Sequence, residues 1–359
     1  MPMNKIEKLI KELCPNGVEW KKLGEVCQVL RGKRLTKSQL SETAKYKVYH
    51  GGIEPIGFYD KKNRDADSVM IINVGASAGT IGYSYEDFWS SDGCFCISHS
   101  YIFCDRFLYY YLISIEHVII AKVRHAGIPT LDSKVIENIE FPLPPLPIQT
   151  EIVRILDKFV EQQEQLEKLI ELRKKQYEYY REELLKPKEG EKWETKTLGE
   201  CCRILKGNYI TQKNSCPGPY PVVLGGQEPA YYIDKFNHRG EVIAVSRSGV
   251  SAGFISYWNQ DIFVSDGFML EPLYCSFRYL FLYLKNKQET INSLKRGAGI
   301  PHITTEHLKE LTIPIVSANI EKEIVKKLDS FETTITTLTT ALELSKKRYE
   351  YYRDKMMRF

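Results

Sequence analysis

The sequence predicts an α+β protein with two pseudo-symmetric mixed α/β domains, separated by two long antiparallel helices that form a coiled coil. Three observations lead to this fold class. The chain repeats itself once, each repeat ends in a long heptad pattern, and each repeat contains short strand patterns. A length of 359 residues is enough for two or three domains, and an apolar share of 43% can fill globular cores.

The internal repeat is visible in short matching motifs. They occur at residues 23–25 and 198–200, 75–79 and 249–253, 91–93 and 265–267, and 126–129 and 298–301. The offset falls from 175 at the first pair to 172 at the last, as small loop insertions would cause. This period is far longer than that of a stacked solenoid, so we interpret it as a duplicated domain.

Each repeat ends in a heptad pattern typical of a long helix that packs on one partner helix. The first pattern starts at Ile152 and the second at Ile324, and both end in Tyr-Glu-Tyr-Tyr-Arg. We therefore expect an antiparallel intramolecular pair. Its predicted seam consists of Ile152, Leu156, Phe159, Leu166, Ile170, Tyr177 and Tyr180 in the first helix, and Ile324, Leu328, Phe331, Ile335, Leu338, Leu342, Tyr349 and Tyr352 in the second.

These patterns divide the chain into four segments. We expect a first globular domain over residues 1–146, a helix over 147–186, a second globular domain over 187–316 and a helix over 317–359. Pro147 suits the first turn of a helix, because the N–H that it lacks is not needed there. The middle of the second helix is rich in Thr, which has a low helix propensity, so packing along the seam must stabilise it.

The globular domains show paired strand and helix patterns. Residues 69–74 and 80–84 predict a hairpin around a Gly/Ser/Ala turn, and residues 242–246 and 254–257 repeat it. Residues 94–97 and 268–270 predict buried strands. Residues 106–112 and 278–284 predict helices rich in aromatic side chains.

At this level of detail the chain resembles a known family. Two globular domains, each followed by a long helix with the ending Tyr-Glu-Tyr-Tyr-Arg, resemble the specificity subunits of type I restriction-modification systems. The opening Cys-Pro-Asn-Gly-Val-Glu-Trp-Lys-Lys-Leu-Gly-Glu at residues 14–25 is also similar to the start of such subunits. The resemblance implies a non-catalytic subunit with two target recognition domains, each for one half of a split, asymmetric sequence in double-stranded DNA. It also implies that the helices form the spacer between the halves.

The resemblance implies partners as well. Two methyltransferase subunits would bind this chain and would carry S-adenosylmethionine, so no cofactor is expected in the chain itself. Translocating nuclease subunits are optional further partners for cleavage. Helix length supports the spacer role independently, because about 38 residues at about 1.5 Å per residue span roughly 57 Å. Two recognition surfaces at a fixed separation would read half-sites with unread base pairs between them.

Three kinds of loop in each domain are candidates for DNA contact: a basic loop after the first strand, a glycine-rich region, and a basic stretch before the domain ends. Lys and Arg neutralise phosphates, whereas Arg, Asn and Gln can also bind base edges through paired hydrogen bonds. The candidates are Arg31, Lys33, Arg34, Lys37, His50, Ser77, Arg124, His125 and Thr130 in the first domain, and Lys206, Asn208, Tyr209, Gln212, Lys213, Asn214, Gln227, Arg247, Ser248, Ser251, Lys295, Arg296 and His302 in the second. A single basic side chain on a loop is more often solvated surface, so the prediction is stronger for the set than for each member.

Two tyrosines, Tyr179 and Tyr351, lie off the predicted seam. They are candidates for the surface that docks the methyltransferase subunits. The other clustered tyrosines are better explained by packing at helical spacing than by stacking on bases.

No metal site and no catalytic residue are predicted. Cys94, Cys96, His99 and Cys104 have a metal-like spacing, but at offset 174 the first three correspond to Phe268, Leu270 and Leu273, which are typical of a core.

The Glu-x-Lys pairs at 19–21 and 194–196 lack the Pro-Asp partner of a nuclease motif. A nuclease that uses these pairs remains one alternative, and a coiled-coil scaffold without DNA readout is the other. The net charge of +4 is mild, so composition alone does not indicate a nucleic-acid partner. Without a signal peptide or an apolar membrane span in the sequence, we expect a cytoplasmic protein with no membrane partner.

Overall fold

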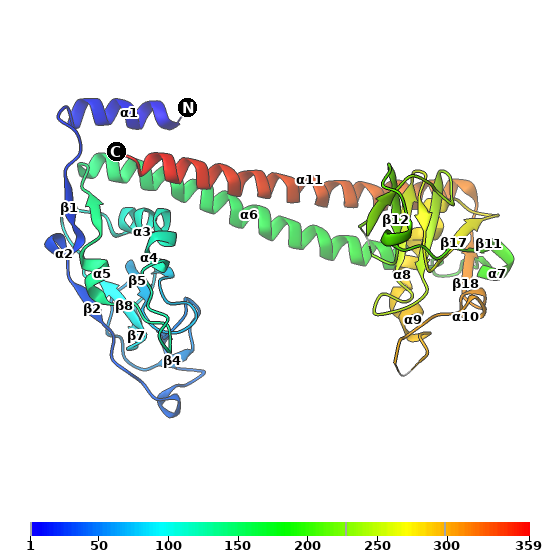
Figure 1. Cartoon of the computed structure of the whole chain (residues 1–359), viewed down its shortest axis with the longest axis horizontal. Coiled ribbons are helices and arrows are strands. Elements are labelled where there is room, and N and C mark those ends of the chain that lie inside the picture. The colour runs from blue at the N-terminus through cyan, green and yellow to red at the C-terminus, as the bar shows by residue number, and fades with distance from the viewer. Residues whose placement is uncertain (1, 227, 298) are drawn as a thin grey trace. The chain divides into compact units, whose positions relative to one another are not determined.

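The computed structural model describes residues 2–226, 228–297 and 299–359, and the chain divides into two compact units (Figure 1). The first unit is Met1–Glu167 together with Thr340–Phe359, and the second is Lys168–Thr339. Each unit therefore contains one globular domain and a part of both long helices. Ala298, in the second copy of one repeat motif, lies outside the described residues.

The long helices are α6 (Leu146–Leu184) and α11 (Ala318–Met356), each of 39 residues. In the Thr-rich part of α11, hydroxyl groups donate to the carbonyl oxygen four residues earlier, as from Thr336 to Glu332 at 2.9 Å. The hydroxyls of Thr334, Thr337 and Thr339 do the same. These bonds satisfy the hydroxyls on the helix itself, but bonding of this kind slightly weakens a helix. Packing of side chains such as Ile335 and Leu338 along the seam therefore has to stabilise this stretch.

The two helices run antiparallel within each unit. In the first unit Phe159 of α6 stacks on Tyr352 of α11, with 5.8 Å between ring centroids. In the second unit Tyr180 of α6 stacks on Phe331 of α11 at 5.3 Å. Each time an early residue of one helix meets a late residue of the other, and the two stacks are equivalent under the offset of 172. The pairing is therefore pseudo-symmetric, and its aromatic contacts come from the predicted seam.

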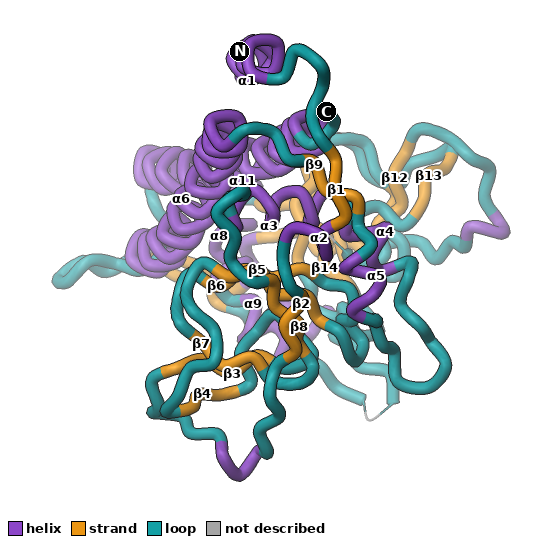
Figure 2. The backbone as a smooth tube through the Cα atoms, turned by 90° about the vertical axis from the view of Figure 1, so that its left-hand side faces the viewer, coloured by secondary structure: helices purple, strands orange, loops and turns teal. Residues whose placement is uncertain are grey.

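The first globular domain contains three small sheets (Figure 2). A four-stranded antiparallel sheet has the order β2-β8-β5-β6, and a three-stranded sheet has the order β4-β3-β7 with β3 and β7 parallel. The ribbon β1–β9 joins the first strand of the domain to the last. The strands are β1 (Trp20–Lys22), β2 (Val29–Arg31), β3 (Tyr46–Tyr49), β4 (Gly57–Tyr59), β5 (Ser68–Ile72), β6 (Ile81–Ser84), β7 (Phe88–Ser90), β8 (Cys94–Ile97) and β9 (Glu140–Pro142).

The second globular domain has the same topology. Its sheets have the orders β11-β17-β14-β15, β13-β12-β16 and β10-β18, with β12 and β16 parallel. The strands are β10 (Glu194–Thr197), β11 (Cys202–Lys206), β12 (Tyr220–Val223), β13 (Tyr231–Ile233), β14 (Glu241–Ser246), β15 (Ile255–Asn259), β16 (Phe263–Val264), β17 (Gly267–Pro272) and β18 (Thr312–Ile315).

Short helices complete both domains. The first domain has α2 (Leu23–Val26), the 3-10 turn η1 (Lys37–Gln39), α3 (Asp105–Ser114), α4 (Glu116–Ile120) and α5 (Ser133–Glu137). The second has α7 (Leu198–Cys201), η2 (Gln212–Asn214), α8 (Phe277–Asn286), α9 (Gln288–Ser293) and α10 (Thr305–Lys309). The helices predicted from aromatic runs are α3 and α8, and the predicted hairpins are β5–β6 and β14–β15.

An amphipathic helix, α1 (Pro2–Leu13), precedes the first domain. Ile6 is buried in the core of the first unit, and the Lys5 ammonium lies 3.0 Å from the Glu151 carboxylate of α6. These contacts attach α1 to the start of the long helix. Among the helices that the structure describes, none is long and apolar enough to cross a membrane.

Strand register corrects one predicted equivalence. Phe95 pairs with Ile71 in β5, and Phe268 pairs with the corresponding residue of β14, Val245. Cys94 and Cys96 therefore correspond to Gly267 and Met269, and the match to Phe268 and Leu270 was wrong by one residue. The physical reason is that the turn before β17 is one residue shorter than the turn before β8, although both contain Ser-Asp-Gly.

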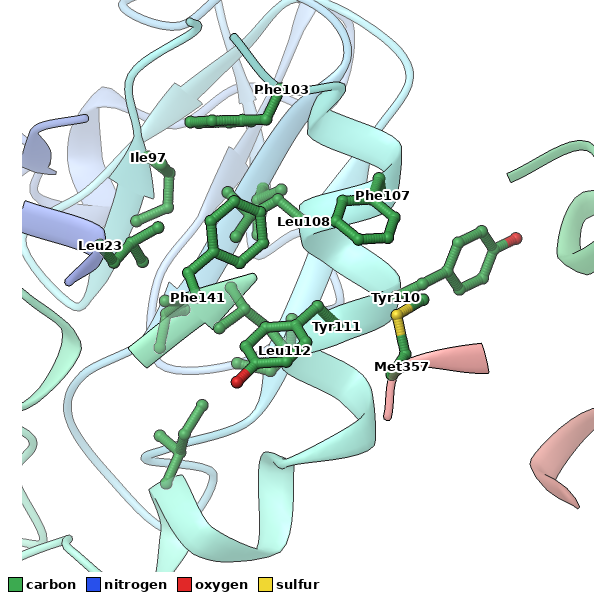
Figure 3. Close-up of a cluster of buried hydrophobic side chains, with 14 of the residues drawn as sticks. Leu23, Ile97, Phe103, Phe107, Leu108, Tyr110, Tyr111, Leu112, Phe141 and Met357 are labelled. Atoms are coloured by element: carbon green, nitrogen blue, oxygen red, sulfur yellow. The ribbon is translucent and has the colours of Figure 1, made fainter. Parts of the chain in front are cut away.

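The core of the first domain is aromatic (Figure 3). Phe141 of β9 lies among Phe103, Phe107 and Tyr111, with ring centroids 5.4 to 5.8 Å away. Edge-to-face and tilted contacts of this kind add to the gain from burial alone. Because Phe141 lies just before α6, this cluster connects the sheet, α3 and the start of the long helix.

A second, smaller core shows how the duplicated domains diverged. Met70 of β5 faces Cys96 of β8, and both are fully buried. At the equivalent positions Ala244 of β14 faces Met269 of β17, also buried. The large and the small side chain have exchanged strands, so the space between the strands is filled in both domains.

Candidate nucleic-acid interface

The predicted DNA-binding loops of the first domain meet at one edge of its sheets. Lys33 N–H donates to the Ser90 carbonyl at 2.9 Å, and the Lys33 carbonyl accepts from the Trp89 indole at 2.7 Å. The loop after β3 joins the same edge, because Gly51 N–H donates to the Gly93 carbonyl at 3.4 Å. The basic loop after β2 and the glycine-rich loop thus lie on either side of the turn before β8.

The third basic stretch of the first domain reaches this edge too. Arg124 and Thr130 exchange two backbone hydrogen bonds of 2.9 and 3.0 Å, which close a small loop. Gly75 N–H, in the turn that also carries Ser77, donates to the Pro129 carbonyl of that loop at 2.9 Å. The sheet order therefore brings together loops from three separate parts of the sequence.

The second domain repeats this convergence. Arg296 and His302 exchange two backbone hydrogen bonds of 2.9 Å, and Gly249 N–H donates to the Pro301 carbonyl at 2.9 Å. The loop after β11 is attached through Gly207 N–H, which donates to the Gly267 carbonyl at 2.8 Å. The Gly249 contact and the Arg296–His302 pair are equivalent to those of Gly75 and of Arg124–Thr130, whereas the basic loop is attached through Gly207 here and through Lys33 in the first domain.

Glycine is required where the basic loop crosses the neighbouring turn. A Cβ added to Gly32 would lie 2.0 Å from the Ser91 carbonyl oxygen, and one added to Gly207 would lie 2.3 Å from the Val264 carbonyl oxygen. Any side chain there would push the loop away from the edge. This explains why both repeats have a glycine at this position, in Arg31-Gly32 and in Lys206-Gly207.

Most of the predicted contact residues are exposed at these edges or on the loops that lead to them. In the first domain the exposed residues are Arg31, Lys33, Arg34, Lys37, His50, Arg124 and His125, whereas Ser77 and Thr130 are partly buried. In the second domain the exposed residues are Lys206, Asn208, Tyr209, Gln212, Lys213, Asn214, Ser251, Arg296 and His302, whereas Arg247, Ser248 and Lys295 are partly buried. Gln227 lies outside the described residues. These roles in DNA contact stay predictions.

The two edges differ in their polar detail. In the first domain, Nδ1 of His50 lies 3.4 Å from the Asp92 carboxylate. In the second, the Arg247 guanidinium places two nitrogens, Nε and Nη2, at 2.7 and 2.6 Å from one oxygen of Asp266, and the Ser248 hydroxyl donates to the other oxygen. The two edges therefore carry different polar groups, which would allow the domains to read different sequences.

Two hollows lie in the second domain beside these residues. The first, of about 450 Å³, is lined by Lys206, Arg247, Ser248 and His302, together with Phe268 and residues 300 and 303–305. The second, of about 440 Å³, is lined by predicted residues including Asn208, Tyr209 and Asn214. The sequence did not single out Lys235 and Asn237, which also line the second hollow.

The internal repeat marks Asn237 as a structural residue. Its amide donates to and accepts from the backbone of Val264, and Asn63 makes the same two bonds to Ser90 in the first domain. The two asparagines are equivalent at offset 174, so the repeat could have identified them as structural. Lys235 has no such signal, because its position depends on the fold of the loop.

A polar joint fastens each globular domain to its long helix, and the sequence analysis missed it. Arg106 of α3 donates to Asp157 of α6, and Arg278 of α8 donates to Asp329 of α11, both at 2.8 Å. Both arginines lie against aromatic rings, four of them at 4.7 to 4.9 Å from Arg106. Burial, hydrogen bonds and cation–π contacts together fix the angle between domain and helix. The two arginines are 172 residues apart in the sequence, and so are the two aspartates. This repetition of both partners could have predicted the joint.

The first turn of each long helix adds a second contact to this joint. Gln149 accepts from the backbone N–H of Cys104 at 2.8 Å, and Glu321 accepts from that of Ser276 at 2.9 Å. Both bonds satisfy a donor at the start of the helix that carries the arginine. Domain and helix are therefore held at two points in both units.

The predicted seam and docking residues differ in how far their side chains are exposed. Ile152, Leu156, Ile170, Ile324 and Leu328 are buried, whereas Phe159, Leu166, Tyr177, Phe331, Ile335, Leu338, Leu342, Tyr349 and Tyr352 are partly buried. Tyr180 is 43% exposed although its ring stacks on Phe331. Tyr179 and Tyr351 are 61% and 59% exposed, and a role in docking stays a prediction.

The Glu-x-Lys pairs and the cysteines of β8 have surroundings typical of structural residues. Lys21 pairs with Glu19 and Lys196 with Glu194, each at 3.1 Å, so the charges of both Glu-x-Lys motifs are paired within the motif. Across residues 2–226, 228–297 and 299–359, no group of three His, Cys, Asp or Glu side chains is arranged to hold a metal ion. Cys94 and Cys96 are buried in β8.

Comparison with known proteins places these features in a family. The family described as "Type I restriction modification DNA specificity domain" matches residues 15–174 and again residues 190–345. A Haemophilus influenzae protein with a provisional assignment as a type I restriction enzyme specificity subunit is 28% identical, over 99% of this chain and 98% of that protein. The EcoR124I/EcoR124II specificity subunit of Escherichia coli is 30% identical over 60% of each chain. The crystal structure of a type I restriction-modification S subunit from M. genitalium has a similar fold, with a TM-score of 0.72 and 20% identity over 96% of this chain and 97% of that one.

Proposed function

This chain belongs to the type I restriction-modification DNA specificity family, and from that premise we propose that it selects the DNA sequence on which a type I complex acts. Each globular domain reads one half of a two-part, asymmetric target in double-stranded DNA. The long helices α6 and α11 set the number of unread base pairs between the halves. The chain contributes recognition and no chemistry of its own.

One observation carries this proposal: the repeated fold builds a basic loop edge in both domains, with different side chains on it. The edge of the first domain carries Arg31, Lys33 and Arg124, and that of the second carries Lys206, Arg247 and Arg296. Basic side chains supply affinity for any DNA through phosphate contacts, and the side chains that differ between the domains supply sequence preference. Two unequal readers in one chain give an asymmetric target.

The chemistry in the complex is assigned to partners. Two methyltransferase subunits bind this chain and carry S-adenosylmethionine, and nuclease subunits that translocate DNA are optional further partners. Tyr179 and Tyr351 are equivalent by the offset of 172, and each belongs to a different unit. Equivalent exposed tyrosines in both units support the docking of one methyltransferase subunit per unit. A cytoplasmic location is part of the proposal, because the DNA and these partners are found there.

A salt titration separates recognition from the scaffold alternative. The complex of this chain with its methyltransferase partner would be titrated with a duplex that contains the two-part site and with a scrambled duplex. Recognition predicts tighter binding to the first duplex and an affinity that falls steeply with salt, with a log–log slope of about −0.9 per phosphate contacted. Equal and salt-independent binding of both duplexes would favour a scaffold.

A further inference from the structure

The most specific polar arrangement at either loop edge is the cluster of Arg247, Ser248 and Asp266. Asp266 accepts from Nε of Arg247 with one oxygen, which also lies 2.6 Å from Nη2, and from the Ser248 hydroxyl with the other. Both oxygens of the carboxylate are therefore engaged. The Arg247 side chain is 39% exposed and lines a hollow of about 450 Å³, so its outer end faces open space.

The shorter turn before β17 explains why the carboxylate lies here. Arg247 N–H donates to the Asp266 carbonyl at 3.1 Å, as Asn73 N–H donates to the Gly93 carbonyl at 3.2 Å in the first domain. Asp266 thus occupies the place of a glycine, with a left-handed φ of 49° that few residues other than glycine adopt. In this conformation the Asp266 carboxylate contacts the guanidinium of Arg247.

The hydrogen-bond geometry leaves a specific set of donors on Arg247. A guanidinium has five N–H donors, and the one on Nε is hydrogen-bonded to Asp266, whereas Nη2 lies 2.6 Å from the same carboxylate oxygen as part of the ion pair. Among the described residues no partner is seen for the two donors on Nη1. These remaining donors form the outer edge of a planar fork whose direction is fixed by the carboxylate.

We infer that Arg247 reads a guanine in the half-site of the second domain, with Asp266 as the residue that positions it. This inference rests on the proposed function and names the base class that this site takes. The free edge of a guanidinium matches the O6 and N7 acceptors of guanine in the major groove. Pairing with Asp266 neutralises the positive charge, which weakens attraction to a phosphate and retains the directional bonds that a base edge requires. Lys206, beside Arg247 in the same hollow, supplies phosphate contact.

The first domain has no equivalent arrangement of an arginine held by a carboxylate at this position. Its residue equivalent to Arg247 is Asn73, which is only 7% exposed and therefore cannot present an extended fork. The carboxylate of Asp92 lies beside His50. The guanine contact is therefore specific to the half-site of the second domain, and the other half-site serves as an internal control.

The test is the methylation motif of the complex, read by single-molecule sequencing of host DNA with variants of this chain. Arg247→Ala should relax one guanine position in one half-site, with a loss of discrimination of about tenfold to a hundredfold. Asp266→Asn should relax the same position to a smaller degree, because the amide keeps one acceptor. The other half-site and the gap should be unchanged in both variants. Arg203→Ala, an exposed arginine in β11 of the same domain, is the matched control and should leave the motif intact.

Lys206→Ala gives the contrast expected of a phosphate contact. It should lower methylation of all sites in similar proportion, with no position relaxed. The inference is wrong if Arg247→Ala lowers methylation uniformly, changes no position, or relaxes a position that is not guanine. If Arg247→Ala abolishes methylation, Arg247→Lys decides. Arg247→Lys keeps the positive charge but lacks the planar fork. A relaxed guanine position in this variant supports the inference, whereas an unchanged motif overturns it. A wild-type chain that yields no two-part motif would instead overturn the proposed function.

Discussion

The exchanged pair of large and small side chains in the two domains allows a quantitative test of the duplicated core. Met70 faces Cys96 across β5 and β8, and Ala244 faces Met269 at the equivalent place. Met70→Ala alone removes a buried side chain and should destabilise the first domain by about 2–5 kcal/mol. Cys96→Met alone overfills the same space and should cost about 1–3 kcal/mol. Independent effects would therefore add to about 3–8 kcal/mol.

The double variant Met70→Ala/Cys96→Met reproduces the arrangement of the second domain. We expect it to lie within about 1.5 kcal/mol of the wild type, because total volume and patterning are conserved. Hydrogen exchange of peptides from β5 and β8 in the full chain is the suitable assay, since a chain with two units need not unfold in one step. The reciprocal double variant Ala244→Met/Met269→Cys is the matched control in the second domain. A double variant as unstable as the sum of the single variants would refute the equivalence of these positions.

Four further predictions follow from the helices and their joints. Deleting residues 166–172 and 338–344, one heptad from each long helix, shortens both by about 10.5 Å and should shorten the unread gap by about three base pairs at 3.4 Å per pair; unchanged gaps in the methylation motif would contradict the spacer role. Arg106→Met removes the joint to Asp157 and should broaden the range of gap lengths methylated on a duplex series, whereas uniform loss at every gap would indicate only instability. Tyr179→Ala with Tyr351→Ala should weaken capture of the methyltransferase partner by about tenfold or more in a titration, as truncation of aromatic interface anchors does, and unchanged capture would refute the docking role. Hydrogen bonds from Arg154, and then from Lys5, lower the pKa of Glu151 to about 2, so the stabilisation from its pairs with Arg154 in α6 and Lys5 in α1 is complete above an unfolded pKa of about 4.5 and is lost as the pH falls toward 2; exchange in the first turns of α6 and in α1 that is equally fast at pH 6 and pH 3, after correction for intrinsic rates, would contradict this.

Local periodicity accounts for the parts of the fold that the sequence made predictable. The heptads gave both long helices, and the strand patterns beside Gly75–Gly79 and Gly249–Gly253 gave both hairpins. These signals lie within continuous stretches of the sequence, so no contact between distant residues is needed to see them. The repeat then doubled the strength of each signal, because a pattern that occurs twice is less easily an accident.

The features that could not be predicted from the sequence depend on contacts between residues that are distant in the chain. The order β2-β8-β5-β6 joins strands that lie far apart in the chain, and no local pattern specifies it. The shorter turn before β17 was missed because Ser-Asp-Gly is intact in both repeats, and only strand register reveals the shift. The pair of Arg247 and Asp266 depends on that turn. The loop residues could be predicted as a basic set, but their arrangement around one edge required the folded sheets.

The most direct test of the account is the methylome of the host with and without the gene for this chain, read by single-molecule sequencing. The account predicts that deletion removes adenine methylation at one asymmetric motif of two parts with a fixed unread gap, and that restoring the gene restores it. An unchanged methylome in cells that demonstrably express the methyltransferase partner would contradict the recognition role and would favour a scaffold.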